Sequence, residues 1–89
     1  MKFTWDARKA AANLKKHGVP FNEASTVLAD PLSATISDPD HSVGEHRFVT
    51  MGVSSSGRLL VVCHTEDTDS IRIISARRAT RHEKDRYEN

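Results

Sequence analysis

The sequence is organised around one stretch near its C-terminal end: Ser70-Ile71-Arg72-Ile73-Ile74-Ser75-Ala76-Arg77. Its β-branched isoleucines favour a β-strand, because branched side chains pack well on a pleated surface. Two arginines interrupt the apolar run. A guanidinium group stays charged, so burying it without an anion is costly. Each arginine therefore reaches solvent, forms a structural ion pair with a carboxylate of the chain, or binds a phosphate.

The length and composition indicate one small domain. The 89 residues suffice for a single core, and no apolar run approaches the length of a membrane span. The N-terminal residues lack the long apolar segment of a secretion signal. The single cysteine, Cys63, leaves no internal disulfide framework and suits a reducing compartment. We therefore expect one domain over residues 1–89, a cytoplasmic location and no membrane partner.

The charges of the chain are unevenly distributed, although the formal net charge is only +1. Acidic residues gather over residues 30–45, and basic residues gather over residues 8–16 and 72–86. If the two basic groups meet on one face, that face suits a polyanion such as nucleic acid. The alternative is that both are solvated helix faces.

Local patterns predict a helical hairpin in the first third of the chain. An apolar stripe at helical spacing predicts a helix over residues 7–17, with Asp6 as its N-cap and Gly18 as its left-handed stop. A second helix is expected over residues 23–29, with Asn22 as its cap. The short link between them favours two helices that pack side by side.

Strands and one more helix are expected after the hairpin. A capping box formed by Thr80 and Glu83 predicts a short C-terminal helix that ends near Tyr87. Runs of apolar or alternating residues predict strands near residues 2–5, 32–37, 46–53, 59–66 and 70–77.

These elements together predict an α+β domain. Its parts are a short N-terminal strand, a two-helix hairpin, an antiparallel sheet of three to four strands, and a short C-terminal helix. We expect the helices of the hairpin on one face of the sheet. The other face must then be covered by the terminal helix, a partner chain or a ligand.

One constellation has the chemistry for RNA cleavage through the 2′-hydroxyl, which needs a base, an acid and fixed positive charge at the phosphorus but no metal. His64 and Glu66 are two apart on one predicted strand, so their side chains point the same way. Arg72 lies on the next strand across a short turn, so the three are expected to adjoin. Arg77 and Lys16 would add phosphate contacts. The alternative is a cross-strand ion pair between Glu66 and Arg72, worth little if exposed.

Two other chemistries are weaker. Asp38, Asp40 and His41 form a small ligand cluster, but no histidine or cysteine spacing matches a zinc site. Cys63 lies in an apolar strand, where a thiol usually serves as a small hydrophobe. We therefore expect neither a metal nor another cofactor.

A longer pattern runs through the chain. It consists of Phe3-x-Trp5-Asp6, Asn13-x-x-Lys16-His17-Gly18-Val19-x-Phe21, Glu23-Ala24, Asp30-Pro31, Glu45-x-Arg47, Gly52, Leu60 to His64, and Ile71 to Arg77 followed by Glu83 and Tyr87. This pattern resembles the BrnT family of type II toxins over nearly the whole chain. The segments that begin at Lys16 and at Ile71 are its most specific parts.

The resemblance implies a small endoribonuclease toxin with a RelE-like fold that cuts RNA and blocks translation and growth. It also implies a BrnA-type antitoxin that carries a ribbon-helix-helix DNA-binding domain. Such an antitoxin neutralises the toxin, and the complex represses its own operon. Contact with operator DNA would therefore be indirect, through the antitoxin.

The resemblance assigns candidate site residues. Lys16, Arg72 and Arg77 stand at motif positions of the family, and we predict that they bind phosphate and stabilise charge. We predict Glu66 as the general base and His64 as an alternative base or the acid. Further RNA contacts are expected from Lys15, Lys16, Arg47, Arg78 and Arg81.

The chain departs from the family pattern at Asp67, where an arginine often follows the glutamate. This change removes one candidate phosphate ligand. The alternative to a ribonuclease is therefore a non-catalytic module that binds the antitoxin and regulates the operon. A stand-alone nucleic-acid binder is a further alternative, and its affinity would depend strongly on salt.

Overall fold

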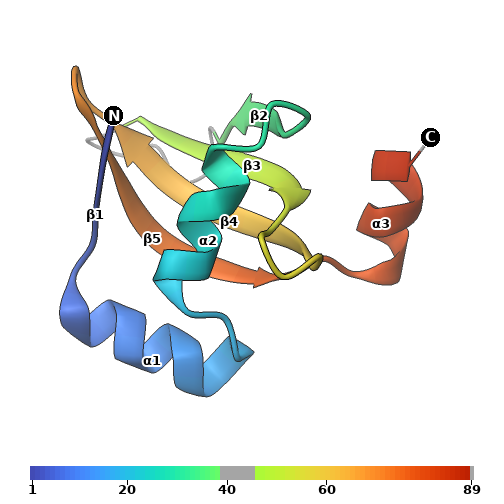
Figure 1. Cartoon of the computed structure of the whole chain (residues 1–89), viewed down its shortest axis with the longest axis horizontal. Helices are drawn as coiled ribbons and strands as arrows, with labels where there is room; N and C mark the ends of the chain where they lie inside the picture. The colour runs from blue at the N-terminus through green and yellow to red at the C-terminus, as the bar shows by residue number, and fades with distance from the viewer. Residues whose placement is uncertain (39–45, 89) are drawn as a thin grey trace.

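A computed structural model describes residues 1–38 and 46–88, and its layout is α+β (Figure 1). The elements in chain order are β1 (Lys2–Thr4), α1 (Ala7–His17), α2 (Phe21–Leu28), β2 (Ala34–Ser37), β3 (Arg47–Val53), β4 (Leu59–Glu66), β5 (Ser70–Arg78) and α3 (Arg81–Glu88). The strands form one sheet in the order β1-β5-β4-β3-β2. The predicted fold class is confirmed, but the sheet has five strands rather than three to four.

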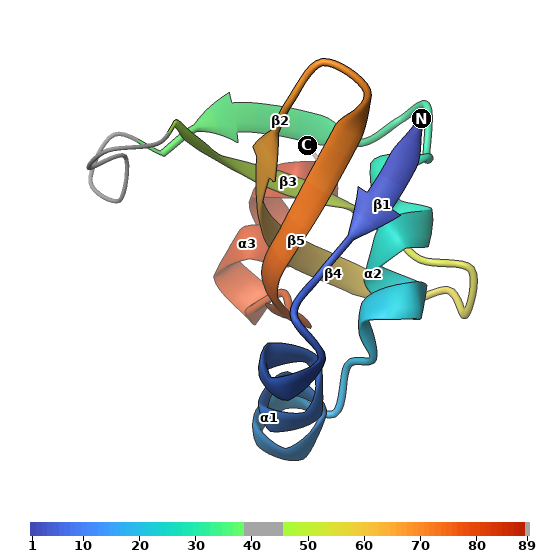
Figure 2. The ribbon, with the colours of Figure 1, turned by 90° about the vertical axis from the view of Figure 1, so that its left-hand side faces the viewer.

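The additional strand is β1, which runs parallel to β5 with Phe3 opposite Ile71. The sheet is therefore mixed, whereas we expected an antiparallel one. A parallel pair needs a long connection between its strands, and here all elements from α1 to β4 provide it. Figure 2 shows β1 beside the first half of β5.

The ends of α1 are set by local contacts and lie where the sequence predicts them. The Asp6 carboxylate accepts a hydrogen bond from the backbone N–H of Arg8 at 2.8 Å, and Gly18 adopts a left-handed conformation with φ of 70°. The prediction for α2 is wrong at its start. Pro20 is the N-cap residue and its carbonyl accepts the first helical hydrogen bonds, so Asn22 lies inside the first turn.

The hydrophobic core lies between the helical hairpin and one face of the sheet. Its buried residues are Val19, Phe21, Ala24, Val27, Leu60, Val62, Ile73 and Ala76. Figure 2 shows α2 and α3 on opposite sides of the sheet. The second face is therefore partly covered by α3, whose Tyr87 hydroxyl donates a hydrogen bond to the Leu32 carbonyl at 3.0 Å. No helix of the described residues is long and apolar enough to span a bilayer.

A buried asparagine joins α1 to the edge of β5. β1 pairs only with the first residues of β5, so the edge further along needs other partners. The Asn13 side chain supplies them, because its Nδ2 donates to the Ala76 carbonyl at 2.8 Å and its Oδ1 accepts from the Ala76 N–H at 3.0 Å. Nδ2 also donates to the Val19 carbonyl. The helical hairpin is thereby fixed against the arginine-bearing strand.

β5 contains one extra residue relative to β4. Ser75 lies opposite Cys63, but Ile73 lies opposite His64, so Ile74 has no partner on β4. Such a β-bulge reverses the alternation of side chains beyond it.

The bulge decides where the two arginines of β5 point. Arg72 and Arg77 are five residues apart and would face opposite ways in a regular strand. In the structure Arg72 lies opposite Thr65 and Arg77 lies opposite Val61. Both arginines therefore lie on the face of the sheet away from α2.

Candidate functional site

A polar hollow lies where β4 turns into β5, and we call it the β4–β5 hollow. Its volume is about 330 Å³. It is lined by Thr4, His46, Thr65, Glu66, Asp67, Ser70 and Arg72. These residues come from β1, from the residue just before β3 and from both sides of the β4–β5 turn, so four separate parts of the chain build it.

The turn between β4 and β5 brings Glu66 and Arg72 to the same hollow. The turn is closed by a hydrogen bond from the Asp67 N–H to the Ser70 carbonyl at 2.8 Å. Glu66 and Arg72 are both exposed. Arg72 lies opposite Thr65, whereas Glu66 lies opposite the buried Ile71, so the two side chains leave the sheet from opposite faces. Within the described part of the chain they form no ion pair with each other.

His64 lies in the core, where the structure does not bring it into the hollow. Only 1% of its surface is exposed, and its Nε2 is 2.7 Å from the Thr50 hydroxyl. Phe48 stacks on its ring at 5.8 Å between centroids. Burial lowers the pKa of His64, and the nearby charge of Glu66 opposes this shift only in part. The expected adjacency of His64 and Arg72 is therefore wrong, because strand pairing sends their side chains to opposite faces.

Arg77 is held by a carboxylate of α3. Its two terminal nitrogens donate to the Glu83 oxygens at 2.7 and 2.9 Å. This pairing lowers the pKa of Glu83 to about 2. Arg77 thus shares its face of the sheet with Arg72 but already has an anion. A guanidinium carries five N–H donors, so its two hydrogen bonds to Glu83 do not use all of them.

Lys16 lies away from the β4–β5 hollow, although α1 brings it near β5. It lines a shallow groove together with Lys9, Ile74 and Ser75. Of the five predicted catalytic residues, the structure places only Glu66 and Arg72 in one hollow.

The other predicted RNA-binding residues surround the sheet. Arg47 of β3 lies opposite Thr65 of β4, and Thr65 lies opposite Arg72 of β5. Thr65 therefore stands between the two arginines on one face of the sheet. Lys15 is exposed in the last turn of α1, and Arg81 is exposed at the start of α3.

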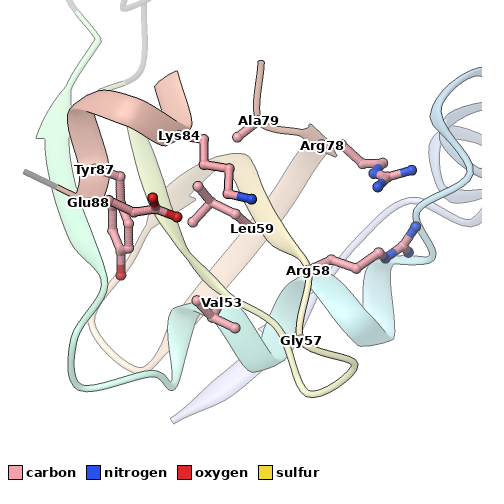
Figure 3. Close-up of a pocket in the computed structure, with 9 residues that line it drawn as sticks. All are labelled: Val53, Gly57, Arg58, Leu59, Arg78, Ala79, Lys84, Tyr87 and Glu88. Carbon is pink, nitrogen blue, oxygen red and sulfur yellow. The ribbon is translucent and has the colours of Figure 1, made fainter. Parts of the chain in front are cut away.

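Arg78 lines a second and larger hollow of about 470 Å³ between α3 and the β3–β4 turn, shown in Figure 3. Arg58 and Lys84 also line it, and Arg58 and Arg78 direct their guanidinium groups toward the same end. The acidic group of this lining is Glu88. Arg58 is paired with Glu23, so Arg78 and Lys84 are the cations of this lining that suit phosphate contact.

His46 is a lining residue of the β4–β5 hollow that the sequence did not single out. Its Nε2 lies 2.7 Å from the Ser37 hydroxyl, and its ring packs on Phe48 at 4.7 Å between centroids. Arg47 lies opposite Thr65, and the same register continued by one residue sets His46 across from Glu66. No motif spacing marks this residue, and only the register of the sheet could have found it.

The candidate metal cluster falls partly outside the described residues, because Asp40 and His41 are not among them. Within residues 1–38 and 46–88, no group of three or more histidine, cysteine or acidic side chains is placed to hold a metal ion.

Comparison with known proteins identifies the family. Residues 5–83 match the family described as "Ribonuclease toxin, BrnT, of type II toxin-antitoxin system", so the chain belongs to this family. The resemblance drawn from the motifs is confirmed, and membership of the family implies an antitoxin partner.

A solved structure supports the fold. The crystal structure of the Brucella abortus ribonuclease toxin BrnT is similar, with a TM-score of 0.66 over 91% of this chain and 99% of that one. The two sequences are 23% identical, so this likeness concerns the fold alone. No curated protein matches the chain.

Proposed function

We propose that this chain is a metal-independent endoribonuclease, the toxin of a type II toxin–antitoxin pair, and that it cleaves RNA in the β4–β5 hollow. The observation that carries the proposal is that Glu66 and Arg72 both line one polar hollow in a chain from a ribonuclease toxin family. The α+β layout agrees with a RelE-like ribonuclease fold.

The two residues have complementary roles in this reaction. The Glu66 carboxylate removes the proton of a 2′-hydroxyl, and that oxygen attacks the adjacent phosphorus. Arg72 donates two hydrogen bonds to the phosphoryl oxygens and balances the charge that develops on them. The bond to the 5′-oxygen then breaks, which leaves a 2′,3′-cyclic phosphate and a 5′-hydroxyl. The permanent charge of the guanidinium performs the charge stabilisation for which other nucleases use a metal.

Basic residues outside the hollow hold the rest of the RNA. Arg47 is the nearest in the strand register, on the same face as Arg72. Arg77 contributes through N–H donors that do not bond to Glu83. Lys15, Lys16, Arg78 and Arg81 contact phosphates further along the strand. Because these contacts are electrostatic, RNA affinity falls steeply with salt.

A BrnA-type antitoxin with a ribbon-helix-helix domain neutralises the toxin by covering the hollow, and the complex represses its operon. Free toxin then cuts cytoplasmic RNA, which blocks translation and growth. A structure of the complex tests this part of the proposal. Full exposure of Arg72 in the neutralised complex would contradict neutralisation by coverage.

The first experiment measures RNA cleavage by the purified chain in excess chelator. We expect new 3′ ends that carry 2′,3′-cyclic phosphate, and a cleavage rate roughly 10²- to 10³-fold lower for Arg72→Ala. The matched control is Arg86→Ala, which removes an arginine of α3 outside the β4–β5 hollow. A folded wild-type chain that binds RNA or antitoxin without cutting would instead establish the non-catalytic module.

A further inference from the structure

The proposed cleavage needs a second proton-transfer group. When the phosphorus–oxygen bond breaks, the leaving 5′-oxygen gains negative charge and must receive a proton. Glu66 acts as the base at that moment. His64, the acid that the sequence suggests, is 1% exposed and bonded to Thr50 in the core. A different residue must therefore supply the proton.

The side chains that line the hollow leave one candidate. Besides Glu66 they are Thr4, His46, Thr65, Asp67, Ser70 and Arg72. Hydroxyl groups and the guanidinium release protons only far above neutral pH, and an aspartate is ordinarily already ionised. Histidine alone both carries and releases a proton near neutral pH.

The geometry of His46 suits this role. It is exposed and immediately precedes β3, and continuing the β3–β4 register by one residue places it across from Glu66. Directly opposite residues on antiparallel strands have Cβ atoms about 5 Å apart. Side chains in such positions can both contact one ribose and its phosphate bound in the hollow.

Two neighbours orient the imidazole ring. Nε2 lies 2.7 Å from the Ser37 hydroxyl, and one side of the ring packs on Phe48. In the protonated ring both nitrogens are donors, so Nε2–H donates to Ser37 and Nδ1–H remains for a ligand.

We propose that His46 is the general acid of the reaction, an assignment that depends on the proposed ribonuclease function. As Glu66 takes the 2′-hydroxyl proton and O2′ bonds to phosphorus, His46 gives its Nδ1 proton to the departing 5′-oxygen. The products are the 2′,3′-cyclic phosphate, the 5′-hydroxyl, a protonated Glu66 and a neutral His46. Exchange with water restores both groups for the next turnover.

Replacing the leaving oxygen by sulfur tests this role directly. A short single-stranded RNA that the wild type cuts is prepared in two forms, with oxygen or sulfur at the 5′-bridging position of the mapped linkage. A thiolate departs without being protonated, so the sulfur substrate needs no acid. The variants are His46→Ala and His46→Gln, and glutamine preserves a hydrogen-bonding partner for Ser37.

We expect both variants to lose about 10²- to 10⁴-fold in kcat on the oxygen substrate, the usual contribution of general acid catalysis. On the sulfur substrate their rates should stay close to that of the wild type. The pH profile of kcat should also lose its alkaline limb, because that limb reports the acid. His82→Ala is the matched control, since it removes an exposed histidine of α3 and should alter neither rate.

Each other outcome is decisive. Equal losses on both substrates would show that His46 positions RNA rather than donating a proton, and an unchanged rate on oxygen would remove it from the site. In both cases the ribonuclease function would stand. A wild-type chain that cuts no RNA would overturn the proposed function and this assignment together. Thermal melting confirms that each variant is folded.

Discussion

The β3–β4 turn and the β4–β5 turn lie at opposite ends of the sheet and have similar side chains nearby. The two groups differ in whether a glutamate and an arginine are paired with each other. At the β3–β4 turn, Glu23 of α2 accepts hydrogen bonds from Arg58 Nε at 2.9 Å and from the Ser54 hydroxyl at 2.6 Å. The Ser56 hydroxyl donates to it as well. Arg58, followed by the two serines, lowers the pKa of Glu23 to about 2. We call this group the Glu23 cluster.

The β4–β5 hollow also holds a glutamate, an arginine and hydroxyl groups, but the glutamate and the arginine are not paired with each other in the described part of the chain. In the Glu23 cluster the charges satisfy one another, so their interaction fastens the β3–β4 turn to α2. In the hollow the hydrogen-bonding capacity remains for a ligand. The pairing of charges, more than their identity, distinguishes a structural cluster from a candidate site.

The largest expected effect comes from neutralising the glutamate of the hollow. Glu66→Gln should lower the RNA cleavage rate by roughly 10²- to 10⁴-fold, because the amide cannot accept the 2′-hydroxyl proton. Its melting temperature should stay near that of the wild type, since Glu66 is exposed. Asp69→Asn removes the same charge from the same turn but outside the hollow, and should leave the rate unchanged. A large loss of stability in Glu66→Gln would break the comparison.

The same substitution in the Glu23 cluster should act on stability instead. Glu23→Gln should lower the free energy of unfolding by roughly 2 kcal/mol, because it removes charge-assisted hydrogen bonds to Arg58 and two serines. Urea titration measures this change, with Glu88→Gln as a control on the exposed side of α3. Cleavage per folded molecule should not change. A loss of activity without a loss of stability would assign Glu23 to the site.

The two histidines near the hollow should differ in the same way as the two glutamates. Replacing His46 should affect activity, and replacing His64 should affect stability. Burial lowers the pKa of His64, so below the ordinary histidine pKa of about 6.5 the unfolded chain binds more protons than the folded one. The stability that the neutral His64 ring contributes is therefore fully present above a pH of about 6.5, and it is lost progressively as the pH falls below this value. The groups that face the His64 ring are the Thr50 hydroxyl, the Phe48 ring and the charge of Glu66.

Urea titrations between about pH 7.5 and pH 5 measure this loss. We expect the free energy of unfolding to fall by at most about 1.4 kcal/mol per pH unit below pH 6.5. His64→Phe should abolish the decline in this window, because phenylalanine fills the site without titrating. The carboxylates of Glu23 and Glu83 make stability depend on pH only in a more acidic range, between their ordinary pKa of 4.5 and their lowered pKa of about 2. An equal decline in wild type and variant would assign it to other groups.

The smallest expected effect concerns Asp67, where the family pattern often has arginine. Asp67→Asn keeps a side-chain oxygen to accept from the Thr68 N–H but removes a negative charge from the hollow. We expect RNA to bind about two- to fivefold more tightly, which corresponds to a weak like-charge repulsion in water. Filter binding at two salt concentrations measures this gain, which should shrink at the higher salt. Weaker binding would mean that Asp67 contacts the RNA itself.

Several elements were predictable from the sequence because their ends depend on neighbours within a few residues. Asp6 and Gly18 delimit α1, and β4 has the predicted bounds of 59–66. Thr80 and Glu83 exchange the hydrogen bonds of the predicted capping box. One local failure is the start of α2, where the carbonyl of Pro20 replaced the expected cap Asn22, and another is β2, which begins at Ala34 rather than at Leu32.

The candidate site was only half predictable. Glu66 and Arg72 share a hollow because a short turn joins their strands, and that was visible in the sequence. His64 was a reasonable candidate by its spacing from Glu66, yet the apolar residues around it mark a strand that is buried in the sheet. His46 joins the site through pairing between β3 and β4, which no local pattern reports.

The sequence by itself determined the positions of helices and strands to within a few residues, and the family, because caps, periodicity and motifs are short-range properties of the chain. Only the tertiary structure decided that β1 joins β5 in parallel, that the bulge at Ile74 turns Arg72 and Arg77 to one face, and that His46 rather than His64 reaches the hollow. Each of these depends on strand register. Register is set by packing between distant segments, and a shift of one residue moves every side chain beyond it to the other face.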